Sequence, residues 1–362
     1  MTLHVLDTMA RLGFEEVHCL HDRRSGLQGF MAIHDTSGGP AFGGVRRMEY
    51  RDEEEALMDC LRLSQAMSHK CVLAGLPAGG AKIVLLDRED VDWPGAYAAV
   101  GRAVDRLGGR LYTGPDVGTG DEELGHMAAE TSYVTDPGPS GPGLLGECTA
   151  EGVFASMEQA VLDLGGHLAE DAGGVAAASI PWGQLTIVIQ GLGVVGMGLA
   201  RRLVGLGARV LASEIDPERA AAAAAELDLE LLPLEQGIGV ECDVLAPCAL
   251  GGILHDLSVE RLRCRAVVGG ANNVLARSLH GDRLHERGIL YVPDFLANAG
   301  ALIRGTLFHL EGIRVAPEDI GLRVANAVRD VLIQARNTSR APARVAAEMA
   351  EDRLEVRRIP SQ

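Results

Sequence analysis

The chain has 362 residues, of which 47% are apolar and 23% are charged, and its formal net charge is -17. This length exceeds what one hydrophobic core usually supports, so we expect two domains of an ordinary globular protein. The acidic balance argues against nucleic acid and anionic membranes as partners, because both require a basic protein surface.

The start of the chain and its cysteines favour a cytoplasmic protein. Residues 1–16 carry acids and lack the basic start and apolar run of a secretory signal. No apolar stretch approaches the length of a membrane span. The seven cysteines are scattered without a CxxC pair, which is typical of a reducing compartment and offers no metal cluster.

Short apolar segments alternate with helical patterns over the first 140 residues or so. The strand candidates are residues 26–35, 81–87 and 109–117, and the helix candidates are residues 52–67 and 93–107. This alternation is typical of an α/β layer.

A second α/β pattern follows a stretch rich in proline and glycine, DPGPSGPGLLG at residues 136–146, which is the best candidate for a domain boundary. Beyond the softer stretch EDAGGVAAAS, strand candidates begin in QLTIVIQ, CDVLAPCAL, RAVVGGANN and ILYVPDFLANAG. The pattern is helical and rich in arginine from about Glu318 onward. We expect domains at residues 1–145 and 146–320 and a helical tail at residues 321–362.

A glycine-rich turn follows the strand candidate LTIVIQ and precedes a helical pattern. Its GxGxxG spacing allows a tight turn and a close approach of pyrophosphate to the helix N-terminus. It predicts a dinucleotide site, with a ligand-free βα turn as the structural alternative. The residues of the turn expected to bind the cofactor are Gly191, Gly193, Val194, Val195 and Gly196.

Glu214 ends the next strand candidate, 23 residues after Gly191. A carboxylate at this position can accept hydrogen bonds from the ribose hydroxyls and would repel a 2′-phosphate. The sequence therefore favours NAD over NADP, although the nearby Arg219 keeps NADP open.

Lys70 and Lys82 are the only lysines of the chain, whose other 31 basic residues are arginine. Arginine is not deprotonated in proteins, whereas a buried lysine can act as a base. Lys82 follows AGLPAGGA and precedes the buried-looking strand IVLL, so it is a candidate base, with a solvated strand-edge lysine as the alternative. Lys70 ends a helix candidate and is either a functional cation or a helix-terminal one. Asp116, which follows a neighbouring strand candidate, is the acid partner or a turn residue.

Seven segments together resemble the amino acid dehydrogenases that include leucine, valine and phenylalanine dehydrogenases, distant relatives of glutamate dehydrogenase. They occur in the family's order and spacing: GPAFGGVRR (39–47), KCVLAGLPAGGAK (70–82), GPDVGTG (114–120), QGLGVVG (190–196), VECDVLAPCALGG (240–252), VGGANN (268–273) and PDFLANAGALI (293–303).

This resemblance implies a two-domain α/β fold. The N-terminal α/β domain would bind substrate and support oligomerisation, and a Rossmann-type doubly wound domain would bind NAD. A catalytic cleft would separate them, with the helical tail returning toward it. The implied reaction is reversible, NAD-dependent oxidative deamination of an L-amino acid to its 2-oxo acid and ammonia. A homo-oligomer is implied as well.

The resemblance also assigns roles to individual residues. Lys82 would activate the water that attacks the imino intermediate, and Asp116 would exchange protons with the amino group. The substrate carboxylate would be held by Lys70 with backbone groups of Gly43 and Gly44. The other implied contacts are Asn298 with substrate and nicotinamide, and Thr149, Ala249 and Asn272 with the cofactor.

The substrate side chain is expected to meet Phe42, Met67 and Gly114. Glycine at position 114 would deepen this pocket and Phe42 would fill it again, so the sequence predicts an apolar substrate without choosing a branched-chain or an aromatic one. Three residues depart from the family's commoner pattern and could lower activity or alter the substrate. They are Ala81, Ala301 and Glu147.

Two other functions remain open at this point. One is a catalytically divergent member of the family that binds NAD as a sensor. The other is a different NAD enzyme, such as a 2-hydroxy acid dehydrogenase, which would require a catalytic histidine. None of the eleven histidines lies in a motif that resembles one.

Overall fold

The computed structural model describes residues 4–166, 180–227 and 229–359 and divides the chain into two compact units. The first unit contains the chain up to Gly143, Gly305–Arg314 and the chain from Ala350, and the second contains Leu144–Arg304 and Val315–Met349. The first division lies close to the expected boundary at 145. The later divisions at 305, 315 and 350 differ from the expected one at 320. The stretch at 170–179 lies outside the described residues.

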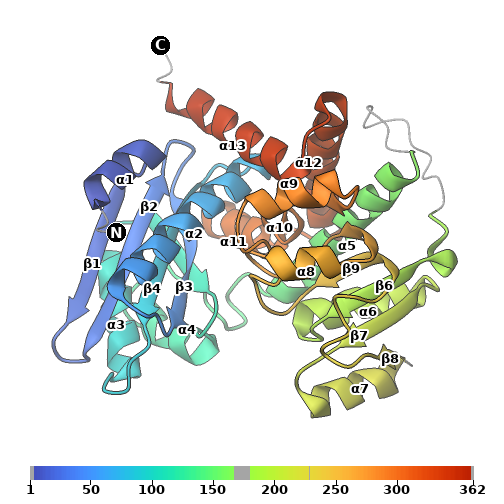
Figure 1. The fold of residues 1–362 in the computed structure, drawn as a ribbon. Coiled ribbons are helices and arrows are strands. Elements are labelled where there is room, and N and C mark those ends of the chain that lie inside the picture. The colour runs from blue at the N-terminus through green and yellow to red at the C-terminus, as the bar shows by residue number, and fades with distance from the viewer. Residues whose placement is uncertain (1–3, 167–179, 228, 360–362) are drawn as a thin grey trace. The chain divides into compact units, whose positions relative to one another are not determined.

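The first unit is built on a five-stranded mixed sheet of order β1-β2-β4-β3-β5. Strands β3, β4 and β5 run parallel, and β1 and β2 are antiparallel to their neighbours. Its elements are α1 (Val5–Leu12), β1 (Glu16–Asp22), β2 (Leu27–Asp35), β3 (Ala41–Met48), α2 (Glu53–Leu73), β4 (Gly79–Leu86), α3 (Trp93–Asp105), β5 (Leu111–Pro115) and α4 (Asp121–Ala128). Figure 1 shows α2 lying along this sheet.

Strand β4 is buried on both faces, so each face carries its own set of side chains. Ala81, Ile83 and Leu85 pack in a core with α3 and α4. Val84 and Leu86 pack in a second core with α1 and α2. Because side chains alternate along a strand, the side chain at position 82 belongs to the face that α2 covers. The lysine at this position is therefore buried between the sheet and α2.

The second unit is built on a six-stranded parallel sheet of order β11-β10-β9-β6-β7-β8. This order is that of a Rossmann fold, in which the ligand lies where the strand order reverses, here between β6 and β9. The strands are β6 (Thr186–Gln190), β7 (Arg209–Ser213), β8 (Glu230–Leu231), β9 (Cys242–Pro247), β10 (Cys264–Val267) and β11 (Leu290–Tyr291).

Helices alternate with these strands, as the sequence predicts. They are α5 (Leu145–Leu164), the short 3-10 helix η1 (Trp182–Gln184), α6 (Val194–Gly205), α7 (Pro217–Leu227), α8 (Asp256–Arg261), α9 (Leu279–Glu286), α10 (Asp294–Ala297) and α12 (Pro317–Thr338). Two more helices, α11 (Gly300–Glu311) and α13 (Pro342–Arg358), each contribute residues to both units. In the described part of the chain, no helix has both the length and the apolar character needed to cross a membrane.

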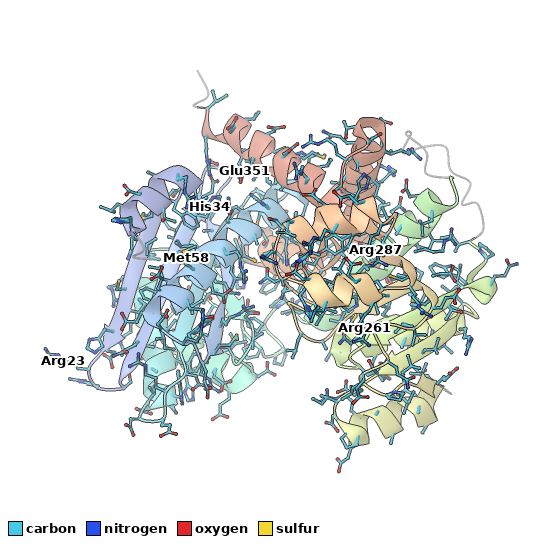
Figure 2. All side chains as sticks on the ribbon, in the orientation of Figure 1. Arg23, His34, Met58, Arg261, Arg287 and Glu351 are labelled. Atoms are coloured by element: carbon cyan, nitrogen blue, oxygen red, sulfur yellow. The ribbon has the colours of Figure 1, made fainter. Side chains whose placement is uncertain are left out.

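The last turns of α13 belong to the first unit and hold its polar groups in place. Glu351 accepts a hydrogen bond from His69 at 2.7 Å, and Arg358 donates to Asp35 at 2.7 Å. Beside them, His34 on β2 is fully buried, and Figure 2 marks it together with Glu351. His34 donates from Nε2 to the carbonyl of Leu12 at 3.1 Å and accepts at Nδ1 from the Ser68 hydroxyl at 2.8 Å. Burial lowers the pKa of this imidazole to about 4.

His34 therefore makes stability depend on pH. Its pKa in the fold lies below the unfolded value of about 6.5, so the unfolded chain binds more protons and the contribution of His34 is lost as pH falls from about 6.5 toward about 4. We expect this one group to cost on the order of 2 kcal/mol at pH 5. Thermal unfolding at pH 7 and pH 5 should show a smaller pH effect for His34→Gln than for the unchanged protein. His21→Gln, at an exposed site on β1, should behave like the unchanged protein; equal pH effects in all three would contradict this account.

Candidate active site

Three parallel strands bring the candidate catalytic residues of the first unit to one level of the sheet. Val45 on β3 pairs with Ile83 on β4 and with Pro115 on β5. The residues next to these, Lys82 and Asp116, therefore lie on either side of β3. Both side chains are buried, with exposed fractions of 6% and 9%.

A single carboxylate oxygen links the two candidates. Lys82 Nζ lies 2.6 Å from Asp116 Oδ2, and Arg46 Nε donates to the same oxygen at 2.9 Å. Burial opposes ionisation of Asp116, but the ammonium and the guanidinium outweigh it and hold the pKa of this carboxyl well below its usual range. Asp116 is therefore an anion that balances a lysine and an arginine.

Arg46 extends this ion pair to α2. Its Nη1 donates to Asp59 Oδ2 at 3.0 Å, and the Tyr50 hydroxyl donates to the same oxygen at 2.9 Å. Arg46 and Asp59 are nearly as buried as the Lys82 pair, with exposed side-chain fractions of 9% and 11%. Four charges of balanced sign thus share one buried layer between the sheet and α2.

Missing side chains allow these groups to meet. A Cβ on Gly44 would lie 2.5 Å from the carbonyl oxygen of Pro115 and 3.0 Å from the Cβ of Asp116. A Cβ on Gly43 would lie 1.8 Å from the carbonyl oxygen of Ala81. The two glycines expected to help hold a substrate carboxylate thus also let Asp116 approach β3 and let β3 approach β4.

Lys70 lies in the last turn of α2 and is buried, with 8% of its surface exposed. Helix α2 comes close to β4 at Gly80, where an added Cβ would lie 2.1 Å from the Ser68 backbone nitrogen. Lys70 lies two residues after Ser68 on the helix, and Lys82 lies two residues after Gly80 on the strand. The glycine-rich stretch between the lysines therefore brings the helix and the strand that carry them into direct contact.

The three residues expected to meet a substrate side chain all belong to the first unit. Phe42 is buried and stacks on Tyr112 with ring centroids 4.9 Å apart. Met67 is half-buried on α2. The position of a Cβ on Gly114 lies only 2.9 Å from the Thr135 hydroxyl, so this threonine takes up part of the space that glycine leaves.

His309 of α11 adds a polar group to this aromatic cluster. Its ring lies 5.2 Å from that of Tyr112 and 6.3 Å from that of Phe42. Its Nε2 lies 3.5 Å from the Thr135 hydroxyl. Burial lowers the pKa of His309, which favours a neutral ring among these aromatic side chains.

In the second unit, the GxGxxG turn joins β6 to α6 and has the backbone features that a dinucleotide needs. Gly191 has a positive φ of 94°, and a Cβ there would lie 2.7 Å from that of Ala249. A Cβ on Gly196 would lie 1.9 Å from the carbonyl oxygen of Gly191. By contrast, no atom of the described residues lies within 4 Å of a Cβ built on Gly193, which leaves room at the helix N-terminus.

The two valines of the turn differ in their surroundings. Val194 is exposed and lies against Gly146 of α5, where an added Cβ would be 2.3 Å from its side chain. Val195 packs against Gly270, where an added Cβ would be 2.6 Å away. The turn is thus held between α5 and the segment after β10.

Glu214 lies just after β7, with only 3% of its side chain exposed. It accepts hydrogen bonds from the backbone N–H groups of Leu192 at 2.7 Å and Asp216 at 3.0 Å. Burial acts to raise the pKa of Glu214, but these backbone donors and Arg219, at 3.4 Å, keep it below its usual range. A fixed carboxylate beside the glycine turn fits a ribose with free hydroxyls.

Asn298 and its neighbours complete the same edge of the second sheet. The Asn298 amide donates to Asn272 Oδ1 at 2.8 Å, while its own Oδ1 is buried and accepts no hydrogen bond from any described residue. Thr149 Oγ1 accepts from the Ala301 backbone at 3.3 Å. A buried acceptor without a donor next to a glycine cradle is the pattern expected of a site that binds a polar ligand. The residues present therefore fit a dinucleotide.

The three departures from the family pattern are accommodated. Ala81 is fully buried in the core on the α3 side of β4. Ala301 offers its backbone N–H to Thr149. Glu147 is exposed in the first turn of α5, where an acid interacts favourably with the helix dipole.

Sequence reasoning missed several residues around the site. Arg46 could have been found from the sequence, because it lies in the segment GGVRR, two residues after the candidate glycine Gly44. Thr135 and His309 gave no signal, because each lies far along the chain from the motif that it contacts. Asp59 lies only 13 residues after Arg46, but the sequence does not show which acid of its helix faces the sheet.

Two family models match the chain. One, described as Glu/Leu/Phe/Val dehydrogenase, dimerisation domain, covers residues 15–133, and the other, Glutamate/Leucine/Phenylalanine/Valine dehydrogenase, covers residues 214–308. A leucine dehydrogenase of Thermoactinomyces intermedius is 35% identical over 98% of this chain and 95% of its own length. A phenylalanine dehydrogenase of the same organism is 35% identical over 98% of this chain and 96% of its own length.

A solved structure is similar over the same span. The L-tryptophan dehydrogenase of Nostoc punctiforme matches with a TM-score of 0.80 and 30% identity, over 98% of this chain and all of that one. The chain belongs to the glutamate, leucine, phenylalanine and valine dehydrogenase family. It is an oxidoreductase of the amino acid dehydrogenase type, with the two-domain α/β fold and the Rossmann sheet that the sequence predicts.

The glycine turn can be tested with two substitutions in one helix. Gly196→Ala places a methyl group against the Gly191 carbonyl and should distort the turn, whereas Gly205→Ala meets no described atom within 4 Å. We expect Gly196→Ala to weaken NADH binding by at least tenfold, about 1.4 kcal/mol, and Gly205→Ala to leave it unchanged. Quenching of protein fluorescence on titration with NADH measures both. Equal affinities would show that this turn does not hold the nucleotide.

Proposed function

We propose that this protein catalyses the reversible, NAD-dependent oxidative deamination of an apolar L-amino acid, branched-chain or aromatic, to its 2-oxo acid and ammonia. The buried contact between Lys82 and Asp116 at 2.6 Å carries this proposal. A buried lysine that contacts a buried carboxylate is a candidate for general acid–base catalysis.

The residues of the first unit would bind the substrate and handle its protons. Lys70 stays a cation and holds the substrate carboxylate, helped by the backbone at Gly43 and Gly44. Neutral Lys82 removes a proton from the water that attacks the imino carbon. Asp116 balances the lysine and exchanges protons with the amino group that leaves as ammonia.

The residues of the second unit would bind the cofactor. NAD, when bound, accepts the hydride from the substrate Cα at C4 of its nicotinamide. Backbone N–H groups at Gly193–Gly196 would hold the pyrophosphate, and Glu214 the ribose hydroxyls. Thr149, Ala249, Asn272 and Asn298 would contact the nicotinamide half. The carboxylate of Glu214 supports NAD over NADP, because a 2′-phosphate would meet a like charge.

An apolar side chain is supported by the surroundings of Phe42 and by the names of the relatives. Phe42 stacks on Tyr112, and the neutral ring of His309 lies next to both. The similar proteins are named for leucine, phenylalanine and tryptophan. We also propose a homo-oligomer, since the model that matches residues 15–133 is described as a dimerisation domain.

The test is an absorbance assay of NADH formation at alkaline pH with a panel of L-amino acids, repeated with NADP and with 2-hydroxy acids. We expect turnover with leucine, valine, phenylalanine or tryptophan and weak turnover with glutamate. NADH binding without turnover of any amino acid would instead support a sensor, which no present observation favours. Turnover of 2-hydroxy acids alone would refute deamination.

Two substitutions of one residue separate charge from proton transfer. Lys82→Met removes both, whereas Lys82→Arg keeps a cation next to Asp116 that cannot be deprotonated. We expect both variants to lose 10²- to 10⁴-fold in kcat, about the contribution of a general base. NADH affinity should stay unchanged in both, because the glycine turn belongs to the other unit. Substantial activity of Lys82→Arg would exclude Lys82 as the base.

A further inference from the structure

We propose that Arg46 is a positioning residue that makes the neutral form of Lys82 accessible, because it keeps their shared carboxylate paired when the lysine gives up its proton. This inference deepens the proposed function and rests on it for its role in turnover.

The geometry places Arg46 in direct competition with Lys82. Both donate to one oxygen, Oδ2 of Asp116, at 2.9 Å and 2.6 Å. The guanidinium is buried and is fixed at its other end by Asp59 at 3.0 Å. Its planar fork thus contacts two carboxylates at once, and unlike a lysine it stays charged.

The four charged groups of this network come from four different elements. Arg46 comes from β3, Lys82 from β4, Asp116 from the end of β5 and Asp59 from α2. Arg62 of α2 contacts the other oxygen of Asp59 at 3.1 Å from the solvent side. Two neighbouring groups stay neutral, since burial raises the pKa of Cys60 to about 12 and raises that of Tyr50 well above its usual value.

The cost of deprotonating Lys82 depends on what remains beside Asp116. With Arg46 present, loss of the lysine proton leaves an arginine–aspartate pair. Without it, the same step leaves a buried carboxylate with no cation, which is strongly unfavourable. Arg46 therefore lowers the cost of forming the neutral amine, and it does so through its contact with Asp116.

Asp59 acts in the opposite direction. It draws part of the Arg46 fork away from Asp116 and adds negative charge near Lys82. Replacing it with asparagine keeps a hydrogen-bond acceptor for Arg46 and removes the charge. The positive charge of Arg46 is then balanced by Asp116 alone, so Lys82 should lose its proton more readily.

The two lysines of the chain make a direct test possible. Selective ¹³C labelling of lysine gives only two ε-carbon signals, and the Lys82→Met variant assigns them. We would follow the Lys82 signal from neutral to alkaline pH in the full chain, without substrate, for the unchanged protein and three variants. Arg46→Met should move the titration midpoint of Lys82 upward by about one pH unit, and Asp59→Asn should move it downward.

Arg47→Met is the matched control. Arg47 is the next residue of β3, but it points to the other face, where it lies 4.6 Å from the Trp93 ring and 3.6 Å from Asp87. Its removal should leave the Lys82 midpoint in place. A midpoint unchanged in Arg46→Met, or raised in Asp59→Asn, would overturn the proposal, and if Arg46→Met does not fold, Asp59→Asn decides.

The pH profile of kcat/KM for oxidative deamination connects the titration to turnover. Its acidic limb should move with the Lys82 midpoint, upward in Arg46→Met, whereas a merely structural role would lower activity without moving the limb. The substrate titrates identically in all variants, so a difference in the position of the acidic limb between variants comes from the enzyme. The two proposals can fail separately. If the variants shift the Lys82 midpoint as expected but the unchanged protein turns over no amino acid, the proposed function is refuted and the ionic coupling is established.

Discussion

The buried carboxylate of Asp116 is the constraint on which the first unit's site depends. A carboxylate with 9% of its side chain exposed has lost most of its hydration, and only well-placed cations can compensate for that loss. Lys82 and Arg46 supply them, and each comes from a different strand. The register of β3 with both β4 and β5 is therefore an electrostatic requirement as well as a feature of the sheet. A slip by one residue would turn the lysine or the arginine to the opposite face and leave buried charge behind.

Glycines provide the close distances that this arrangement needs. Gly43, Gly44 and Gly80 lie where an added Cβ would come within 1.8 to 2.5 Å of a backbone atom of a neighbouring element. The second unit uses the same device at Gly196 and at Gly300, whose added Cβ would lie 1.9 Å from the Cys148 carbonyl. In each unit, many of the candidate site residues thus lie on or directly after closely packed strands and helices, which restrict their positions.

The sequence predicts the kind of fold well because the signals are local. A strand, a glycine turn and a helix follow one another within a few residues at Gly191, and the acid at Glu214 ends the next strand, so the Rossmann sheet is confirmed. The charge network is different. Arg46 and Arg47 are adjacent and identical in type, and only the alternation of β3 sends one to Asp116 and the other to Trp93. Asp59 follows three acids of the same helix, Glu53–Glu55, and its role comes from facing the sheet. Such assignments depend on which face a residue occupies in the folded chain.

Lys82 and Asp116 form one buried ion pair, so the charge of each depends on the other. While both cations contact Asp116, its pKa lies well below its usual range, so the carboxylate is a poor proton acceptor at neutral pH. In the proposed reaction, loss of the Lys82 proton would remove one of the two cations and make the carboxylate more basic. Under the proposed function, Asp116 would therefore exchange protons only after Lys82 has given up its own. Arg46, which cannot be deprotonated, is the fixed charge that keeps this exchange from leaving the carboxylate unpaired.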